Sequence, residues 1–265
     1  MKKRTTRDLR IAKRAKTKRT LSMLTCYDFQ TASMLNQTNL DMLLVGDSLG
    51  NVILGYETTV EVSLEEMIIF SAAVKRGAKE KFVIADLPFG SYSTFELGVK
   101  NALELFQKSK VEALKLEGAF PHQLEIVQRC VVSGVPIVGH IGLTPQSVHE
   151  LGGYYTHGKD QANAERLMKE ALALQEAGAF AIVLECVEAK LAAEITKTLS
   201  IPTIGIGSGA ETDGQVLVIN DLLQMGPTAP PKFCQPITNL FLEKKQWIEK
   251  YLNTLEENDK VTLDH

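Results

Sequence analysis

The sequence predicts a (β/α)8 barrel, a closed ring of eight parallel strands surrounded by helices, and three observations support this fold class. The chain has 265 residues, and one such barrel takes roughly 250. Eight short runs rich in leucine and β-branched residues alternate with longer segments whose apolar residues recur three and four positions apart. Turn residues such as Gly178 and Pro202 separate these units. We therefore expect residues 1–265 to form a single barrel domain with a helical extension at each end.

Each element is predicted from its own pattern. The predicted strands are Leu21–Tyr27, Met42–Gly46, Phe82–Asp86, Ala113–Glu117, Pro136–Ile141, Ala179–Glu185, Thr203–Ile206 and Gln215–Ile219. The predicted helices are Asp28–Asn36, Ser63–Arg76, Phe95–Gln107, His122–Val132, Asn163–Ala177 and Glu188–Leu199. Strands joined by helices pair in parallel, because each helix returns the chain to the same end of the sheet. An open doubly wound sheet is the alternative, and the number of predicted strands favours the closed barrel.

The two ends of the chain lie outside this alternation. Residues Lys2–Arg19 are locally basic, a composition found in mitochondrial presequences, in arms that bind nucleic acid and in solvated helices. The scarcity of apolar residues there favours a solvated helix ahead of the first strand. Residues Glu243–Glu257 have the pattern of a final helix, and Asn258–His265 is expected to be a loose tail.

The composition argues against several classes of protein. A net charge of −3 is unfavourable for binding nucleic acid or a membrane surface. No apolar run approaches the roughly 18 residues that a membrane helix needs. The four cysteines show no CxxC spacing and follow no apolar signal segment; they are Cys26, Cys130, Cys186 and Cys234. We expect reduced thiols and a cytoplasmic location.

Ionisable residues lie at the carboxyl ends of five predicted strands. In a (β/α)8 barrel these ends form one face, and active sites lie on that face. The residues are Asp47, Asp86, Lys115 with Glu117, His140 and Glu185. One such residue is common as a helix cap, but its repetition on five strands predicts a functional site.

Lys115 and Glu117 are two positions apart, so strand geometry places both side chains on the same side of the sheet. Burying a lysine and a glutamate in a barrel is costly unless the two charges are paired or bind something. Two interpretations are open: an ion pair that only holds the barrel together, and a functional site with perturbed charges.

Three carboxylates, those of Asp47, Asp86 and Glu117, are expected to converge on the same face. Like charges repel at short range, so a cation is expected among them. Ligands that are all oxygen suit Mg²⁺. Zinc is less favoured, because His140 is the one histidine near the cluster and no cysteine clearly faces it.

Three loops could take part in binding. The glycine-rich run after Asp47 could hold an anion on exposed backbone N–H groups, and so could Gly205–Gly209, although both could be ordinary loops. The stretch Gly142–Asp160 is longer than most loops of this kind. It could cover the substrate as a lid or form an oligomer contact.

These motifs also resemble a known family. The runs MLTCYD, LLVGDSLGNVILGY, ADLPFGSY, ALKLEG, VPIVGHIGLTPQSVHELGGY, IVLE and PTIGIGSG resemble ketopantoate hydroxymethyltransferases in order and spacing. The resemblance covers roughly residues 20 to 225, which is the whole predicted barrel. The combination of VGDSLG with GHIGLTPQ is specific, whereas GDS or GIG alone would not be.

The resemblance implies an activity. Ketopantoate hydroxymethyltransferases transfer a hydroxymethyl group from 5,10-methylenetetrahydrofolate to 3-methyl-2-oxobutanoate, giving 2-dehydropantoate on the way to pantothenate and coenzyme A. They are similar to the phosphoenolpyruvate mutase and isocitrate lyase barrels, which use Mg²⁺ to stabilise enolates. The resemblance therefore implies one Mg²⁺ per subunit, and it also implies a homo-oligomer, since bacterial members form homodecamers.

The resemblance also implies roles for individual residues. Asp47 and Asp86 would bind the metal directly, and Glu117 would belong to the metal's surroundings. The contacts to the oxo acid would come from Asp47, Ser48, Asp86 and Lys115. Glu185 would be the proton acceptor, and its place on a different strand suits an approach to the β-carbon.

The chain departs from the family pattern at three places. Ser208 lies where the family commonly has alanine, Asn220–Asp221 lies where it commonly has His-Asp, and KFCQPITNL differs from a basic, tyrosine-containing segment. These departures concern folate contacts, the lid or subunit packing rather than the chemistry.

Two other functions are open. One is a Mg²⁺-dependent lyase or mutase of the same superfamily, which usually carries a cysteine-bearing loop that neither Cys26 nor Cys186 resembles. The other is a catalytically silent barrel scaffold, which the intact set of charged residues disfavours.

Overall fold

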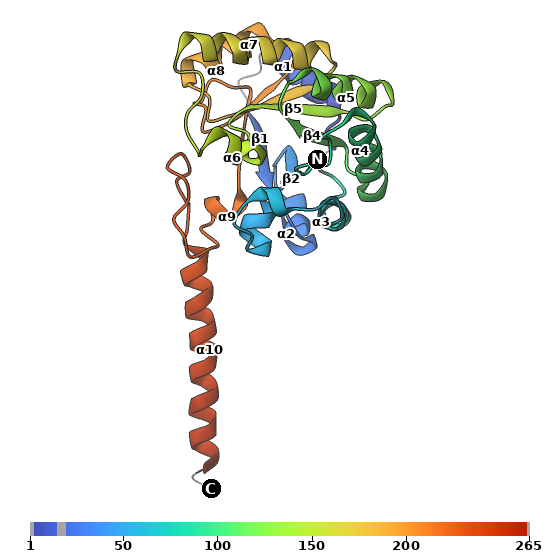
Figure 1. The fold of residues 1–265 in the computed structure, drawn as a ribbon. Coiled ribbons are helices and arrows are strands. Elements are labelled where there is room, and N and C mark those ends of the chain that lie inside the picture. The colour runs from blue at the N-terminus through green and yellow to red at the C-terminus, as the bar shows by residue number, and fades with distance from the viewer. Residues whose placement is uncertain (1–2, 15–19, 264–265) are drawn as a thin grey trace. The chain divides into compact units, whose positions relative to one another are not determined.

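A computed structural model describes residues 3–14 and 20–263 of the chain. In this part of the chain eight parallel strands form a closed barrel (Figure 1). Each strand pairs with its neighbour in the sequence, and the first strand pairs with the last. The predicted barrel is confirmed, and the open doubly wound sheet is wrong. The strands are β1 (Leu21–Thr25), β2 (Met42–Val45), β3 (Phe82–Asp86), β4 (Ala113–Glu117), β5 (Ile137–Gly142), β6 (Ala181–Glu185), β7 (Thr203–Ile206) and β8 (Gly214–Leu217).

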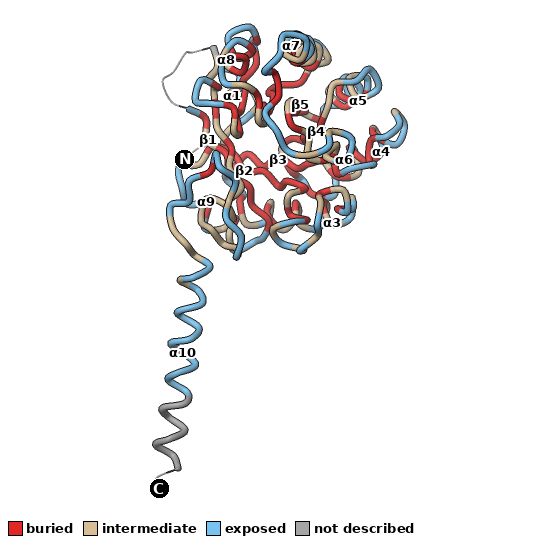
Figure 2. The backbone as a smooth tube through the Cα atoms, turned by 60° about the vertical axis from the view of Figure 1, so that its left-hand side comes forward, coloured by how far each residue is buried: buried red, intermediate tan, exposed pale blue. Residues whose placement is uncertain are grey.

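Helices cover the outside of the barrel, each with its buried residues facing the strands (Figure 2). The main ones are α2 (Phe29–Asn36), α3 (Leu64–Gly77), α4 (Phe95–Ser109), α5 (Pro121–Val132), α7 (Gln161–Glu176) and α8 (Ala189–Thr198). They correspond to the six predicted helices, with ends that differ by a few residues. The loops also contain short helical turns that the sequence pattern did not predict: η1 (Gly50–Leu54), η2 (Thr59–Glu61), η3 (Pro145–Ser147) and α6 (Val148–Leu151).

Helix α3 shows how local sequence sets an element. It begins after Ser63, whose hydroxyl accepts a hydrogen bond from the Glu66 N–H at 3.2 Å, while the Glu66 carboxylate accepts from the Ser63 N–H at 2.7 Å. It ends at Gly77, where an added Cβ would lie 2.5 Å from the carbonyl oxygen of Phe29. The glycine therefore permits the close approach of α3 to α2.

The barrel interior explains why charged residues gather at one end. Phe82 and Ile84 on β3 belong to the apolar cluster that fills the barrel. Side chains on a strand alternate between its two faces, so Asp86 points to the same side as these residues, one step further along. The same period applies to Val183 and Glu185 on β6. On β3 and β6 the inward face is thus apolar along most of the strand and ionisable at its carboxyl end.

The N-terminal basic segment forms α1 (Thr6–Arg14), so the predicted helix is confirmed. The expectation that it is merely solvated is wrong, because Leu9 is 1% exposed and belongs to the same apolar cluster as the strand residues. Arg4 pairs with Asp41 at 3.0 Å, just before the helix. Residues 15–19 lie outside the described part of the chain.

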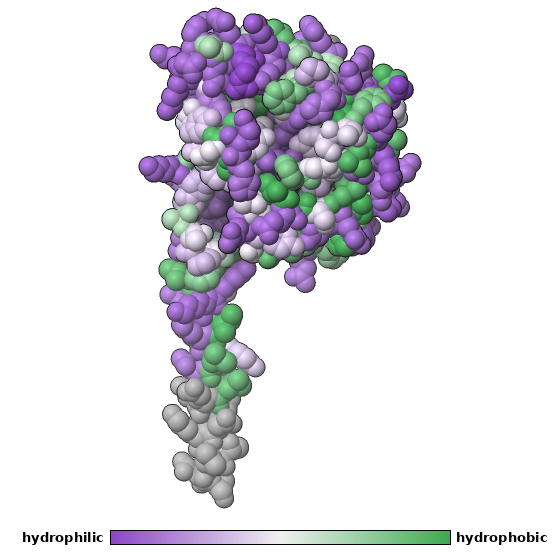
Figure 3. Space-filling model, viewed as in Figure 1, coloured by the Kyte–Doolittle hydropathy of each residue, from purple (hydrophilic) through white to green (hydrophobic). Residues whose placement is uncertain are grey.

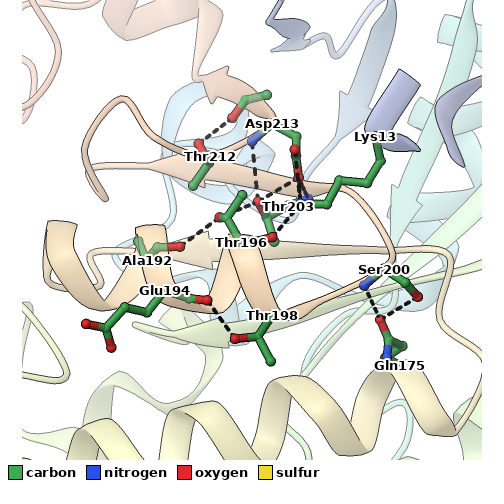
Figure 4. Close-up of polar contacts among 11 residues, drawn as sticks. Lys13, Gln175, Ala192, Glu194, Thr196, Thr198, Ser200, Thr203, Thr212 and Asp213 are labelled. Atoms are coloured by element: carbon green, nitrogen blue, oxygen red, sulfur yellow. Dashed lines mark hydrogen bonds and ion pairs between the residues drawn. The ribbon is translucent and has the colours of Figure 1, made fainter. Parts of the chain in front are cut away.

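Lys13 at the end of α1 is held by a polar network at the start of β7 and β8 (Figure 4). Its ammonium lies 2.9 Å from the Asp213 carboxylate, which also accepts hydrogen bonds from the Thr203 N–H at 2.9 Å and from the Thr203 hydroxyl at 3.1 Å. The Thr203 hydroxyl lies 2.7 Å from that of Thr196 on α8. One half-buried carboxylate thereby joins α1 to β7, and through Thr203 to α8, at the end of the barrel opposite the ionisable cluster.

Residues Val218–His265 form a second compact unit, described here by itself. It contains α9 (Ile219–Leu222) and α10 (Leu240–Leu263). The predicted final helix is confirmed, but it begins earlier and continues to Leu263, so the predicted loose tail is wrong up to that residue; residues 264–265 lie outside the described part. The large apolar residues of α10 are exposed. In Figure 3 a group of green, hydrophobic atoms lies on part of this helix.

Among the described residues, no helix combines the length and the apolar composition needed to cross a membrane.

Candidate active site

The structure brings the predicted residues together at the carboxyl ends of β2 to β6. Five of them are almost completely buried: Asp47, Asp86, Lys115, Glu117 and His140. Glu185 ends β6 and is more open, with a side chain that is 18% exposed. Five charged or titratable groups buried in one place cannot be explained as helix caps, since caps lie at the surface.

Lys115 is at the centre of the charged cluster. Its ammonium lies 3.1 Å from Asp86 Oδ2 and 3.6 Å from Glu117 Oε1. Burial works against the charged form of this lysine, but the carboxylates of Asp86, Glu117 and Asp47 outweigh it and raise the pKa of Lys115 above its usual value. The ion pair between Lys115 and Glu117 therefore exists. Asp47 and Asp86 belong to the same cluster, so one lysine does not neutralise all of its carboxylates.

Asp47 and Asp86 carry the excess negative charge. Burial raises the pKa of Asp47 well above its usual value, and the charges of Asp86 and Glu117 raise it further. Burial also raises the pKa of Asp86, against the opposing effect of Lys115. Asp86 Oδ2 accepts a hydrogen bond from the Asp47 N–H at 3.2 Å, whereas Asp86 Oδ1 is buried without a hydrogen-bond partner among the described residues. A buried carboxylate oxygen with no donor, beside a second carboxylate, fits a bound cation.

Glu117 is placed differently, because both of its oxygens have partners. Oε1 lies 3.3 Å from His140 Nδ1 and 3.6 Å from Lys115, and Oε2 accepts a hydrogen bond from the Gln146 N–H at 3.2 Å. Burial acts to raise the pKa of Glu117, but His140 and Lys115 outweigh it, and the pKa is lowered. Glu117 is thus an ionised carboxylate whose oxygens are already engaged within the protein.

His140 connects the buried cluster to Glu185. Its Nε2 lies 3.3 Å from Glu185 Oε2, which is an ion-pair distance without the alignment of a hydrogen bond. Burial and Lys115 act to lower the pKa of His140, but Glu117 and Glu185 outweigh them and raise it to about 9. Lys115 Nζ lies 3.2 Å from His140 Nδ1, so this ring nitrogen has both a cation and a carboxylate beside it.

Ser48 begins the glycine-rich loop after β2. Its hydroxyl lies 2.8 Å from the hydroxyl of Tyr27. A Cβ added at Gly46 would lie 2.8 Å from Ser48 Oγ, so a side chain there would displace the Ser48 hydroxyl. The N–H groups of Leu49 and Gly50 donate to the carbonyl groups of Gly46 and Asp47, so these two do not serve the anion site that the sequence suggested.

The loop after β7 has a structural role. Ser208 in this loop is buried, and its hydroxyl accepts a hydrogen bond from the Val187 N–H at 2.9 Å and donates to the Leu184 carbonyl at 2.8 Å. The Ser208 hydroxyl therefore fastens the loop to the end of β6, next to Glu185.

The long loop Gly142–Asp160 supplies residues that the sequence analysis missed. Gln146 is 4% exposed and donates a hydrogen bond to Asp47 Oδ2 at 2.7 Å. The hydroxyl of Tyr92, from the loop after β3, donates to the other end of the Gln146 side chain. The run GLTPQS was visible in the sequence, but nothing in its periodicity places Gln146 beside a carboxylate.

Tyr154 also belongs to this loop and lies close to the cluster. Tyr154 is 65% exposed, but partial desolvation of its phenol raises the pKa of Tyr154, and so do the carboxylates of Glu185, Asp47 and Glu117. The loop therefore passes over the ionisable face of the barrel, as the lid interpretation requires. Beside it is a cavity of about 510 Å³, with Glu117 and Gln146 among its lining residues and Phe89 and Phe120 at the exposed edge.

Comparison with known proteins assigns the chain to a family. The model of the ketopantoate hydroxymethyltransferase family matches residues 3–259. The chain belongs to the ketopantoate hydroxymethyltransferase family. A 3-methyl-2-oxobutanoate hydroxymethyltransferase from Syntrophus aciditrophicus is 47% identical over 246 residues, which cover 92% of this chain and 90% of the relative. The enzyme of the same name from Thermosipho africanus is 47% identical over 247 residues, which cover 93% and 92%.

A solved structure with a similar fold is 2,3-dimethylmalate lyase, described as a member of the PEP mutase/isocitrate lyase superfamily. It has a TM-score of 0.58 and 14% sequence identity, and the match covers 80% of this chain and 77% of that one. This likeness in fold agrees with the predicted type of (β/α)8 barrel.

Proposed function

We propose that the chain transfers a hydroxymethyl group from 5,10-methylenetetrahydrofolate to 3-methyl-2-oxobutanoate and so forms 2-dehydropantoate. The observation that carries this proposal is the cluster at the barrel mouth, in which buried carboxylates and one lysine lie beside a more open glutamate. The family membership supports it, because relatives at 47% identity have the corresponding name.

The first part of the proposal is a divalent cation, Mg²⁺, one per subunit. No group of three or more His, Cys, Asp and Glu side chains in the described part of the chain is assembled tightly enough to hold a metal by itself. Two neighbouring carboxylates, of which Asp86 has an oxygen without a hydrogen-bond partner among the described residues, suit Mg²⁺, which keeps several waters and leaves positions for a substrate. Asp47 and Asp86 would hold the cation directly, and Glu117, whose oxygens are engaged, would support it from the side.

When bound, Mg²⁺ supplies positive charge where negative charge develops on the oxygens of a 2-oxo acid. The remaining chemistry belongs to the protein. Lys115 provides a fixed ammonium for the carboxylate of the oxo acid, and Ser48 and Asp86 lie within the same cluster. Because the Lys115 ammonium is already held in place, little free energy is spent on reorienting charges when negative charge develops on the substrate.

The second part of the proposal assigns proton removal to Glu185. This glutamate comes from β6, on the far side of His140 from the Asp86 and Lys115 pair. Its side chain is more accessible than the other carboxylates of the site, so it can reach a carbon of the bound oxo acid. The carbon that loses its proton then forms a bond to the methylene carbon of the folate as one carbon–nitrogen bond opens. Water replaces the second carbon–nitrogen bond and supplies the hydroxyl, and tetrahydrofolate leaves with one proton from the oxo acid and one from water on its two nitrogens.

The third part concerns assembly and location. We propose a homodecamer in the cytoplasm. Helix α10 supports association, because large exposed apolar patches are rare on monomeric proteins and usually mark an interaction surface. Its exposed apolar side chains are Phe241, Leu242, Trp247, Ile248, Tyr251, Leu252 and Leu255. Sedimentation of the active protein at the mass of ten chains is expected, and a stable active monomer would contradict the proposal.

The test of the activity is product formation. Purified protein supplied with 3-methyl-2-oxobutanoate, 5,10-methylenetetrahydrofolate and Mg²⁺ should form 2-dehydropantoate, and addition of EDTA should stop the reaction. A superfamily lyase would instead cleave its own carbon–carbon bond, and a silent scaffold would consume neither substrate. Either of these results would reject the proposed function.

A further inference from the structure

Gln146 is the residue through which the loop after β5 contacts the charged cluster. Its side-chain amide donates to Asp47 Oδ2 at 2.7 Å and to the Leu87 carbonyl at 2.9 Å. Its amide oxygen accepts a hydrogen bond from the Tyr92 hydroxyl, and its backbone N–H donates to Glu117 Oε2 at 3.2 Å. The residue is 4% exposed, and all of these partners come from the loops or strand ends of β2, β3 and β4.

These contacts constrain two carboxylates in different ways. The neutral amide occupies Oδ2 of Asp47 without adding charge, which leaves Oδ1 as the oxygen that can face a cation. The backbone N–H of Gln146 occupies Oε2 of Glu117, so that carboxylate is held by the loop on one side and by His140 on the other. A lysine in place of the glutamine would neutralise Asp47, and a glutamate would repel it.

A carboxylate that binds a metal is usually oriented by a hydrogen bond to its other oxygen, and loss of that partner weakens metal binding by roughly 10- to 100-fold. The contact between Gln146 and Asp47 has this arrangement. Two further contacts fix the rotation of the Gln146 amide. The Leu87 carbonyl accepts from its NH2 group, and the Tyr92 hydroxyl donates to its oxygen, so a flipped amide would lose both hydrogen bonds.

We propose that Gln146 is a positioning residue that holds the Asp47 carboxylate in the orientation for a divalent cation and thereby links the metal site to the loop that covers the barrel mouth. This inference rests on the proposed role of Asp47 as a metal ligand. Gln146 then does more than anchor the loop, because it also orients a ligand of the cation. The cation and the covering loop then stabilise each other, since both depend on the same side chain.

The test measures metal binding without turnover. Mn²⁺ replaces Mg²⁺, and the free ion is followed by electron paramagnetic resonance in the absence of both substrates. Gln146→Leu removes all side-chain hydrogen bonds at similar size, and its Kd for Mn²⁺ is expected to rise about 10- to 100-fold. Gln146→Met, which is unbranched and adapts to irregular space, provides a second variant if the first fails to fold.

Two control variants separate orientation of Asp47 from anchoring of a loop. Asn101→Ala removes a buried hydrogen bond, from Nδ2 to the Ser91 carbonyl at 2.7 Å, that holds a neighbouring loop without touching a carboxylate. Tyr92→Phe removes the donor to Gln146, but the Leu87 carbonyl still accepts from the Gln146 amide and the contact between Gln146 and Asp47 stays in place. Both are expected to lower the melting temperature while changing the Kd for Mn²⁺ by less than about threefold, well below the loss of an orienting partner.

The outcomes are distinct. A folded Gln146 variant that binds Mn²⁺ as tightly as the wild type, with only a lower melting temperature, would overturn the inference and leave the proposed function intact. A wild-type protein that binds no Mn²⁺ would overturn the metal assignment and this inference with it. Weakened binding in both Gln146 variants but not in the controls is the expected result.

Discussion

His140 Nε2 lies 3.3 Å from Glu185 Oε2, so the glutamate that ends β6 is next to a buried imidazole. The other ring nitrogen of His140 lies 3.3 Å from Glu117 Oε1. One histidine therefore joins the side of the site with the buried carboxylates to the side with the more accessible one. This arrangement gives the two glutamates different surroundings although they end strands of the same barrel, and the roles proposed for them follow from that difference.

Glu185→Gln tests the proposed base. The substitution keeps the size and hydrogen bonding of the side chain but removes its ability to take a proton. We expect near-normal binding of metal and oxo acid, with product formation reduced by roughly 10²- to 10⁴-fold, the usual contribution of a positioned base. If Glu185 only pairs with His140, the melting temperature would fall and the rate would hardly change, and that pattern would exclude it as the base.

Asp86→Asn tests the metal ligand. The amide keeps the shape of the side chain, but it removes a charge that raises the pKa of Asp47, so folding should be retained. We expect Mn²⁺ binding and Mg²⁺-supported activity to fall by roughly 10²-fold or more, since even an indirect partner of a metal is worth about 10- to 100-fold. Unfolding of this variant, with no specific loss of metal binding, would favour a purely structural role for the cluster.

The raised pKa of His140 leads to a prediction for the pH dependence of the free energy of unfolding in the metal-free protein. This pKa rises from 6.5 to about 9 on folding, because Glu117 and Glu185 outweigh burial and Lys115. The folded state holds the proton more tightly than the unfolded state. The contribution is therefore fully present below about pH 6.5 and is lost as pH rises through about 9. It amounts to at most about 3 kcal/mol.

Urea unfolding in EDTA measures this effect. The wild type should lose free energy of unfolding between about pH 6 and about pH 9, and His140→Gln should show a flatter dependence over the same interval. An identical pH dependence in both proteins would mean that His140 does not hold an extra proton in the folded state.

Leu9→Ala tests the packing at the opposite end of the barrel. Leu9 is 1% exposed within the apolar cluster, so truncation should cost about 2–5 kcal/mol of unfolding free energy. The matched control is Ile11→Ala on the same helix, where the side chain is 48% exposed and a change within about 0.5 kcal/mol is expected. Equal losses in the two variants would contradict the assignment of α1 to the barrel core.

The sequence predicted the site well where strand geometry places a residue. Asp86, Glu117 and Glu185 each end a strand, and Lys115 lies two positions before Glu117, so a period of two places all four on the inward face near the barrel mouth. The fold could be predicted for the same reason, because alternating strands and helices of this number have few other arrangements.

Residues on loops could not be predicted in this way. Gln146 and Tyr154 reach the cluster because the chain after β5 folds back over the barrel, and no periodicity describes that path. Leu9 was missed for a different reason. A single leucine in a short basic helix makes no apolar stripe, yet Leu9 contributes to the core because it packs against the inward-facing strand residues of the barrel.

The central claim is that the barrel mouth makes the 3-hydrogen of 3-methyl-2-oxobutanoate labile. The direct measurement is proton NMR of this oxo acid in D₂O with the wild-type protein and Mg²⁺, and without any folate. We predict steady replacement of the 3-hydrogen by deuterium, which stops on addition of EDTA and is reduced by roughly 10²- to 10⁴-fold in Glu185→Gln. A folded wild-type protein with bound metal that leaves the 3-hydrogen unexchanged would contradict the account.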